Sequence, residues 1–162
     1  MQAEDLFRLA ALPPAELRAL AETVSGTLMP DLQVSATPLG YDWGSPVTAG
    51  LWRVEVTSPD RGGAPGCTFF VKLVRHTRLW PGLRGLPDDA ARAEFIDFYP
   101  WQYELDIYQS GIGSVLPDGM RTPQLHHVSR PDADHVSLWW EFVHERADPW
   151  TLADYRLAAR LL

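Results

Sequence analysis

The beginning of the chain has its apolar side chains at the spacing of an α-helix. In the stretch PAELRALAETV, apolar residues recur roughly every three to four positions, a pattern typical of a helix with one buried face. These residues are Leu17, Leu20, Ala21 and Val24. Pro14 suits the first turn of such a helix, and Gly26 suits its end. The pattern therefore predicts a helical segment over residues 1–30.

From residue 31 the period of the apolar positions shortens to two, which is typical of half-buried β-strands. In the stretch LWRVEVTS, for example, Trp52 and Val54 face one side of the predicted strand and Arg53 faces the other. Strands are expected within residues 31–37, 51–58, 67–76, 121–129 and 135–144.

Helical patterns return between the third and fourth strands and again in the last segment. The first of them begins near Asp88, with Asp88 or Asp89 as the N-cap, and Pro100 opens the next. In the last segment, residues 148–162, Asp148 is the expected N-cap and Pro149 is expected in the first turn.

The short connections between these strands imply an antiparallel sheet of about five strands, with a helix inserted between the third and the fourth. The predicted fold class is therefore α+β. We expect an N-terminal helical segment at residues 1–30, a sheet-containing unit at residues 31–147 and the start of a further helix at residues 148–162.

Composition and charge narrow the class of protein. The 162 residues carry 14 Lys+Arg and 21 Asp+Glu, a formal net charge of −7, which argues against the basic face that binds nucleic acids or anionic membranes. No apolar run approaches the roughly 18 residues of a spanning helix, and the acidic start MQAEDLFRLA does not resemble a secretory signal. Cys67 is the only cysteine, which suits a reducing compartment. We therefore expect a cytoplasmic protein that binds neither nucleic acid nor membrane.

One basic residue differs from all the others. Of the 14 basic residues, 13 are arginines and only Lys72 is a lysine, so its position favours a compact ammonium over a planar guanidinium. In the stretch TFFVKLVRH, Lys72 shares a strand face with Phe70 and Val74, and the opposite face is also apolar. Burying an ammonium between two apolar faces costs on the order of several kcal/mol unless an acid or a phosphate pairs with it. Alternatively, Lys72 lies on an edge strand and extends to the solvent.

The candidate partner of Lys72 is Glu104. In the stretch PWQYELDIYQ, Glu104 borders the packing stripe of its predicted helix, so its carboxylate is expected to point towards the sheet. That stripe consists of Trp101, Leu105 and Tyr108. The alternative is an ordinary solvated acid on the helix surface.

The order of these elements resembles a known family. A glycine-bearing loop between two strands, a lysine on the third strand, a glutamate on the following helix and an acid-containing linker after two more strands are typical of the N-terminal lobe of kinase-like folds. The chain is similar in particular to the aminoglycoside phosphotransferase and choline-kinase-like small-molecule kinases. The similarity runs from about Leu32 to the end and includes the stretches WQYELDIYQSG, HVSLWWEFV and DPWTLADYRLAARLL.

The resemblance implies a set of residues that bind the phosphates of a nucleotide. Lys72 would contact the α- and β-phosphates, and Glu104 would hold Lys72 in position and keep it charged. The loop from Gly44 to Gly50 would cover the phosphates, with Ser45 as a contact, although it departs from the G-x-G-x-x-G pattern of protein kinases.

The resemblance also implies a binding site for the base. The backbone carbonyl of Glu141 and the amide of Val143 would meet the edge of adenine, and Trp140 would lie at the back of the pocket. The implied cofactor is ATP with Mg²⁺, bound by the intact parent protein. The implied second partner is a small-molecule hydroxyl acceptor.

The catalytic aspartate and the metal ligands of this family belong to a C-terminal lobe, and neither an H-x-D-x-x-x-x-N nor a D-F-G string occurs in these residues. We therefore expect the nucleotide-binding lobe of a longer ATP-dependent phosphotransferase, one that transfers the γ-phosphate to an aminoglycoside-like or other small molecule. We expect no catalytic residue and no metal ligand in this segment. Its final helix is expected to leave apolar surface exposed and to favour self-association.

The alternative from a different class is a catalytically silent kinase-like module, or an unrelated α+β domain, that serves in protein interaction. A metal site is a further hypothesis, because several metal-ligating side chains lie near the turn RPDAD. They are His126, His127, Asp132, Asp134 and His135. Their spacing matches no zinc pattern, so we predict that they serve the structure of the turn.

Overall fold

The computed structural model describes residues 3–40, 44–59, 65–144 and 148–161. The helices in these residues are α1 (Ala3–Ala10), α2 (Pro14–Ser25), α3 (Asp89–Phe98), α4 (Tyr103–Gln109) and α5 (Leu152–Leu161). The strands are β1 (Gln33–Pro38), β2 (Thr48–Thr57), β3 (Pro65–Arg75), β4 (Leu125–Asp132) and β5 (His135–Glu141). Short 3-10 helices lie at Thr77–Leu79, Pro81–Gly85 and Ile112–Val115. None of the described helices has the length and apolar character that a membrane crossing requires.

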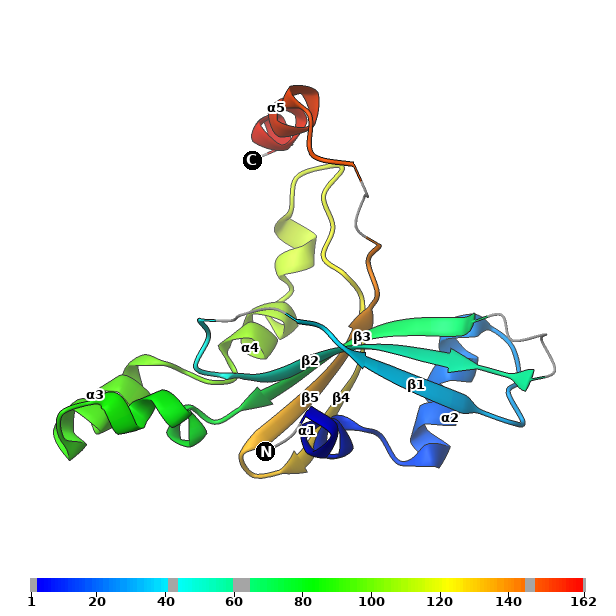
Figure 1. Ribbon diagram of the computed structural model, residues 1–162. Coiled ribbons are helices and arrows are strands. Elements are labelled where there is room, and N and C mark those ends of the chain that lie inside the picture. The colour runs from blue at the N-terminus through cyan, green and yellow to red at the C-terminus, as the bar shows by residue number, and fades with distance from the viewer. Residues whose placement is uncertain (1–2, 41–43, 60–64, 145–147, 162) are drawn as a thin grey trace.

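The strands form one antiparallel sheet in the order β1-β2-β3-β5-β4 (Figure 1). The predicted α+β class and the predicted five-stranded antiparallel sheet are therefore confirmed. Both α3 and α4 lie between β3 and β4 in the chain, where the helical patterns predicted them. Because β3 pairs with β2 on one side and β5 on the other, Lys72 does not lie on an edge strand.

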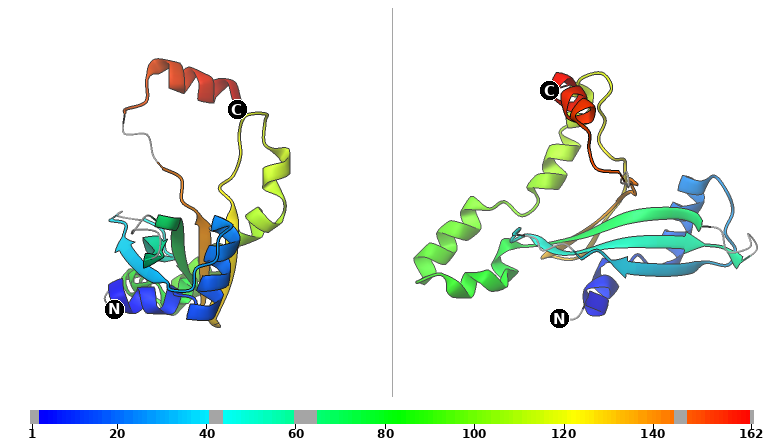
Figure 2. Two further views of the ribbon diagram at one scale, coloured as in Figure 1. Left: turned by 90° about the vertical axis from the view of Figure 1, so that its right-hand side faces the viewer. Right: turned by 45° about the horizontal axis from the view of Figure 1, so that its top comes forward.

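Helices α1 and α2 cover one face of the sheet (Figure 2). The residues of β2 alternate between buried and half-buried, as the pattern of the sequence predicted. The core on this face includes Trp52, Val54, Val56, Phe69, Val71, Leu73 and Trp139, none of them more than 2% exposed. The hydroxyl of Ser137 donates to the carbonyl of Ala10 (2.7 Å) and accepts from the indole N–H of Trp139 (3.0 Å). This face is therefore closed, and these polar groups are satisfied within it.

The opposite face is covered only in part. Leu105 of α4 is 2% exposed and belongs to a smaller core with Val136, Leu138 and Trp140 of β5. Phe70 of β3 packs against this core while remaining partly exposed. Helix α3 projects beyond the end of the sheet (Figure 1).

The last helix begins later than its pattern predicted. The amide of Asp154 donates to Thr151 Oγ1 (3.3 Å), and the amide of Thr151 donates to the Asp154 carboxylate (2.8 Å). This reciprocal pair satisfies two amides at the start of α5, which is why the helix begins at Leu152. The expectations of a cap at Asp148 and of Pro149 in the first turn are therefore wrong. Helix α5 lies apart from the sheet (Figure 2).

Candidate functional site

Lys72 forms an ion pair with Glu104 across the partly covered face of the sheet. Its ammonium contacts Oε2 of Glu104, which lies 32 positions later in the chain on α4. The Lys72 side chain is 17% exposed and the Glu104 side chain 48% exposed. Leu51 and Leu138 stand opposite Lys72 on the neighbouring strands. The predicted contact is therefore formed, and Glu104 is not an ordinary solvated helix acid.

The packing of α4 determines where Glu104 points. Leu105 inserts into the core of this face, and Trp101 and Tyr108 pack against the same core from the same helix. The ring of Tyr108 meets that of Trp140 edge to face, with centroids 4.7 Å apart. With this stripe packed against the sheet, the preceding residue, Glu104, lies at the border of the packed surface and within reach of β3.

A cavity of about 490 Å³ lies beside the end of β5 and the residues that follow it. We call residues 140–144 the linker segment, and all five of them line the cavity. The other lining residues are Leu39, Phe70, Glu104 and Pro123. The cavity thus extends from the linker segment to Glu104, the ion-pair partner of Lys72. Its volume lies within the roughly 300–1,000 Å³ of sites that hold small molecules and cofactors.

Two polar groups on the walls of this cavity have no partner within the described residues. Trp140 is 7% exposed, and its indole Nε1 is buried without a hydrogen bond in this part of the chain. The backbone amide of Val143, which belongs to no helix or strand, makes no hydrogen bond to any described residue. A buried donor such as Trp140 Nε1 gains most from a ligand that offers an acceptor.

The side chain of Glu141 anchors the linker segment to the chain before β4. Arg121 donates to both carboxylate oxygens of Glu141 (2.5 and 2.6 Å), and the amide of Gln124 donates to one of them (3.1 Å). These hydrogen bonds, with that of Arg121 the strongest, lower the pKa of Glu141 to about 2. In addition, the amide of Glu141 donates to the carbonyl of Gln124 (2.7 Å). For Glu141 the sequence predicted a backbone role only, because no local pattern links Arg121 to Glu141.

Arg53 makes a second contact that sequence analysis missed. Its guanidinium lies over the ring of Phe142, 5.3 Å from the centroid, and also pairs with Glu55 (2.6 Å). Arg53 therefore connects β2 with the linker segment across the open face.

The loop before β2 departs in part from its prediction. Because β2 begins at Thr48, part of the predicted phosphate-covering loop is strand. Arg75 holds the end of the loop, since its amide donates to the carbonyl of Val47 (2.8 Å) and its Nε to that of Pro46 (3.1 Å). Ser45 is half-buried and does not line the cavity beside the linker segment. Residues 41–43, which precede the predicted loop, lie outside the described residues.

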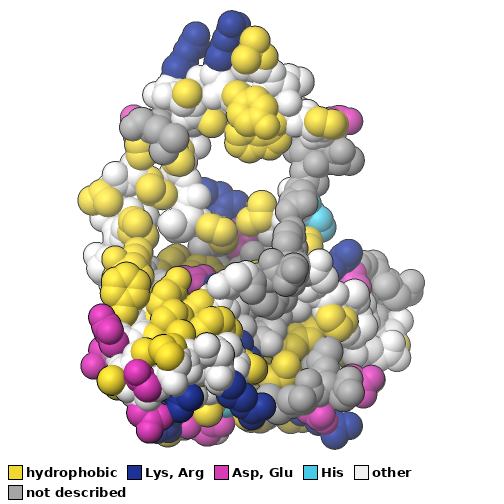
Figure 3. Space-filling view, turned by 60° about the vertical axis from the view of Figure 1, so that its left-hand side comes forward, with side chains coloured by type: hydrophobic (Ala, Val, Ile, Leu, Met, Phe, Trp, Pro, Cys, Tyr) yellow, Lys and Arg dark blue, Asp and Glu magenta, His cyan; other side chains and the backbone are white. Residues whose placement is uncertain are grey.

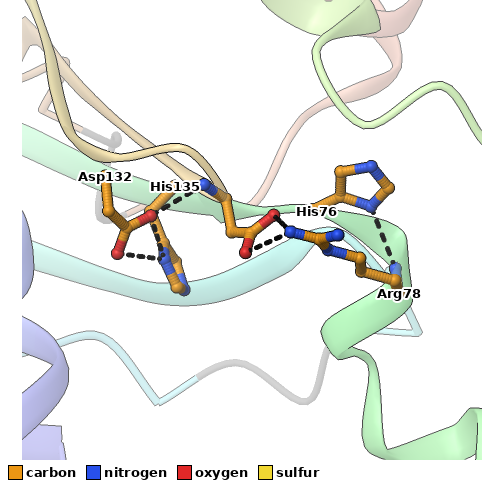
Figure 4. A network of polar contacts seen from close by, with 5 residues as sticks. His76, Arg78, Asp132 and His135 are labelled. Carbon is orange, nitrogen blue, oxygen red and sulfur yellow. Dashed lines mark hydrogen bonds and ion pairs between the residues drawn. The ribbon is translucent and has the colours of Figure 1, made fainter.

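The histidines and aspartates near the β4–β5 turn form a network that shapes the turn (Figure 4). Asp132 accepts from the amide of Asp134 (2.7 Å) and bonds the ring of His135 (2.9 Å). Asp134 in turn binds the guanidinium of Arg78 through both oxygens (2.5 and 2.6 Å), and the amide of Arg78 donates to His76 Nδ1 (3.1 Å). Within the described part of the chain, no group of three or more such side chains is placed to hold a metal ion.

Comparisons of this chain with models of protein families, with curated proteins and with solved structures found no match.

Proposed function

We propose that this chain is the nucleotide-binding part of an ATP-dependent phosphotransferase that acts on a hydroxyl of a small molecule. The observation that carries the proposal is that Glu104, the ion-pair partner of Lys72, lines the cavity beside the linker segment. A fixed ammonium next to a small-molecule cavity suits the phosphates of a nucleotide, since phosphoryl transfer depends mainly on positioning and on neutralising charge.

Lys72 and Glu104 would act as a unit towards the phosphates. The carboxylate of Glu104 holds the ammonium of Lys72 at one place on the sheet, and Lys72 remains partly exposed. An ammonium that is already oriented loses less entropy when a phosphate arrives. In this proposal Lys72 contacts the α- and β-phosphates and Glu104 is a positioning residue.

The linker segment would bind the base. Phe70 and Leu39 supply apolar walls of the cavity, and Val143 offers an amide without a partner among the described residues. A purine is flat, with apolar faces and a polar edge. Its faces would suit the apolar walls of the cavity, and its edge would suit the backbone groups of the linker segment. The backbone carbonyl of Glu141 and the amide of Val143 would meet the polar edge, with Trp140 at the back.

The described residues fit the nucleotide but not the whole reaction. They contain no group of three side chains that could hold Mg²⁺, so the magnesium that accompanies ATP would be held by groups outside these residues. The same applies to the base that accepts the proton of the acceptor hydroxyl. We therefore assign binding and orientation of the nucleotide to this chain and no proton transfer.

The test uses the protein in the form that its gene encodes. Mg·ATP is expected to raise the melting temperature of the native protein, and Lys72→Ala is expected to abolish that increase. Arg84→Ala serves as the control, because Arg84 is exposed and makes no contact with the cavity beside the linker segment. If Mg·ATP raises the melting temperatures of wild type and Lys72→Ala equally, Lys72 does not have the proposed role. If Mg·ATP does not raise the melting temperature of the wild type, the proposal is wrong.

A second candidate function is that of an interaction module without catalysis. Several large apolar residues of the α5 region are more than half exposed, namely Trp150, Leu152, Tyr155 and Leu157. Exposed apolar surface of this kind is typical of a docking site. Association through these residues, without any response to Mg·ATP, would favour this candidate. The self-association expected from the sequence stays a prediction.

A further inference from the structure

Arg53 occupies an unusual position on the open face of the sheet. It stands opposite Phe70 of the neighbouring strand β3, and its guanidinium lies over the ring of Phe142, 5.3 Å from the centroid. The side chain is 41% exposed, yet its Nε is buried and has no hydrogen-bond partner among the described residues. A buried donor without a partner lowers the stability of a fold, so packing alone does not explain why an arginine stands here.

Two neighbouring residues of the linker segment are held from different directions. The side chain of Glu141 is fixed from the chain before β4, whereas the ring of Phe142 is covered by Arg53 of β2. An ion pair of 2.6 Å with Glu55 keeps the guanidinium of Arg53 in place. The next residue is Val143, whose backbone amide makes no hydrogen bond to any described residue. The two contacts together therefore fix the backbone just before the amide that the proposed site offers to a base.

The register of the strands places Arg53 near the linker segment and away from Lys72. Phe70 stands opposite Trp140, where the linker segment begins, whereas Lys72 stands opposite Leu138. Phe70 and Lys72 share one face of β3 and are two residues apart, which is roughly 7 Å along the strand. In the proposed complex the phosphates lie at Lys72 and the base lies at the linker segment, so Arg53 would act on the base alone.

This inference rests on the proposed function. We propose that Arg53 is a positioning residue that sets the affinity of the nucleotide site for the base. Its guanidinium holds the ring of Phe142 as a fixed wall of the cavity, because the face of an aromatic ring attracts a cation. A wall that is already in place loses less entropy when a flat base packs against it and against Phe70 and Leu39. Arg53 contacts neither the phosphates nor the reacting atoms in this arrangement.

A second cavity, of about 580 Å³, provides the control. The loop before β2, the end of α3 and helix α4 form its walls, and Glu104 lines both cavities. Figure 3 shows hydrophobic side chains gathered on this side of the molecule, with acidic side chains next to them. Tyr103 is 59% exposed and is among the described residues that line the second cavity, but it does not line the cavity beside the linker segment. Tyr103→Leu therefore changes the neighbour of Glu104 and leaves the base site intact.

The test measures the dissociation constants of Mg·ATP and of adenosine by isothermal titration calorimetry, using the protein in the form that its gene encodes. Arg53→Leu is expected to weaken both ligands by the same factor, about two- to fivefold, the size of one exposed cation–π contact. Arg53→Lys keeps a cation over the ring and is expected to restore most of the lost affinity. Tyr103→Leu is expected to change neither dissociation constant.

A second measurement needs no nucleotide. NMR relaxation of the isotope-labelled protein reports the motion of each backbone amide on the picosecond to nanosecond timescale. In Arg53→Leu the amides of residues 142–144 are expected to become more mobile than in the wild type. In Arg53→Lys and Tyr103→Leu these amides are expected to move as they do in the wild type.

Four outcomes would overturn the inference while the nucleotide proposal stands. The first is that Mg·ATP binds wild type and Arg53→Leu equally well. The second is that Arg53→Leu weakens Mg·ATP but not adenosine, which would assign Arg53 to the phosphates. The third is that Arg53→Lys loses as much affinity as Arg53→Leu, and the fourth is that Mg·ATP binds the wild type but adenosine does not. If neither ligand binds the wild type, the nucleotide proposal fails, and the inference about the base fails with it. The relaxation measurement then still shows whether Arg53 positions the linker segment.

Discussion

Phe69 and Phe70 are neighbours on β3, yet they lie in opposite environments. Phe69 is fully buried on the face closed by α1 and α2, where its ring meets those of Trp139 and His126 edge to face. Phe70 is partly exposed on the other face and lines the cavity beside the linker segment. Further along the strand, Val71 is completely buried on the closed face, whereas Lys72 pairs with an acid on the open one.

The comparison shows how one sheet separates stability from binding. The closed face buries apolar side chains around satisfied polar groups, which is where burial contributes most to the free energy of folding. Two cavities, an ion pair and polar atoms without a hydrogen-bond partner among the described residues lie on the open face. These features contribute little to stability, and they are the ones a ligand would use.

The largest expected effect separates the two phenylalanines. Phe69→Ala is expected to lower the free energy of unfolding by about 3–5 kcal/mol, because it leaves a cavity among rigid neighbours. Phe70→Ala is expected to cost less than half of that, because solvent already reaches its site. Urea unfolding measures both. If Phe69→Ala does not fold, Phe69→Leu still allows the comparison with Phe70→Leu. Equal costs for the two positions would contradict the division between the faces.

The next effect concerns the polar centre of the closed face. Ser137→Ala removes the acceptor of the Trp139 indole and the donor to the Ala10 carbonyl. Leaving these buried groups unpaired is expected to cost about 1–3 kcal/mol of unfolding free energy. Ser129→Ala is the control, since Ser129 stands opposite Ser137 on β4 and is only partly buried. Similar costs for both serines in urea unfolding would show that the bonds of Ser137 do not matter.

A smaller effect is expected when the charge on the open face is removed. Lys72→Met keeps the apolar stem, and Glu104 is exposed enough to be solvated alone, so the free energy of unfolding is expected to change by less than about 1 kcal/mol. The same variant is expected to lose stabilisation by Mg·ATP. A loss of stability of about 3 kcal/mol or more would instead identify a buried ion pair that the fold needs.

The smallest effect is a pH dependence at the linker segment. The pKa of Glu141 lies at about 2 in the folded chain, below its ordinary value of 4.5, so the pairing with Arg121 stabilises the fold above pH 4.5. This contribution is lost as the pH falls from 4.5 towards 2. The difference in stability between wild type and Glu141→Gln is therefore expected to be constant near neutral pH and to shrink in acid. Glu94→Gln, at an exposed position, is the control and should show no such change.

Local patterns predicted most of the architecture. The alternation along β2 predicted its buried side, and the only lysine was placed on a strand with two apolar faces. The predicted limits were less accurate. The chain before β4 was predicted as strand from residue 121, but the strand begins at Leu125 because Arg121 and Gln124 bind the side chain of Glu141 instead.

The candidate site was predicted only where the order of elements carried information. The pairing of Lys72 with Glu104 was predicted because a strand that carries the lysine is followed by a helix with an acid at the edge of its apolar stripe. The anchor between Arg121 and Glu141 joins residues 20 positions apart, and no repeat or spacing marks it. The cavity between the loop before β2, the end of α3 and α4 was not predicted either, although Trp101 packs against the core as its stripe predicted.

The amino-acid sequence by itself determined the spacing of apolar residues along the chain. That spacing gave the helices and strands and their order, because it follows from the geometry of each helix or strand. Only the tertiary structure decided which face of the sheet is closed, that Glu104 lies between two cavities, and which groups hold the linker segment. These features depend on contacts between segments that are distant in the chain. Such contacts form only where the burial of side chains in the whole fold outweighs the entropy lost in closing long loops.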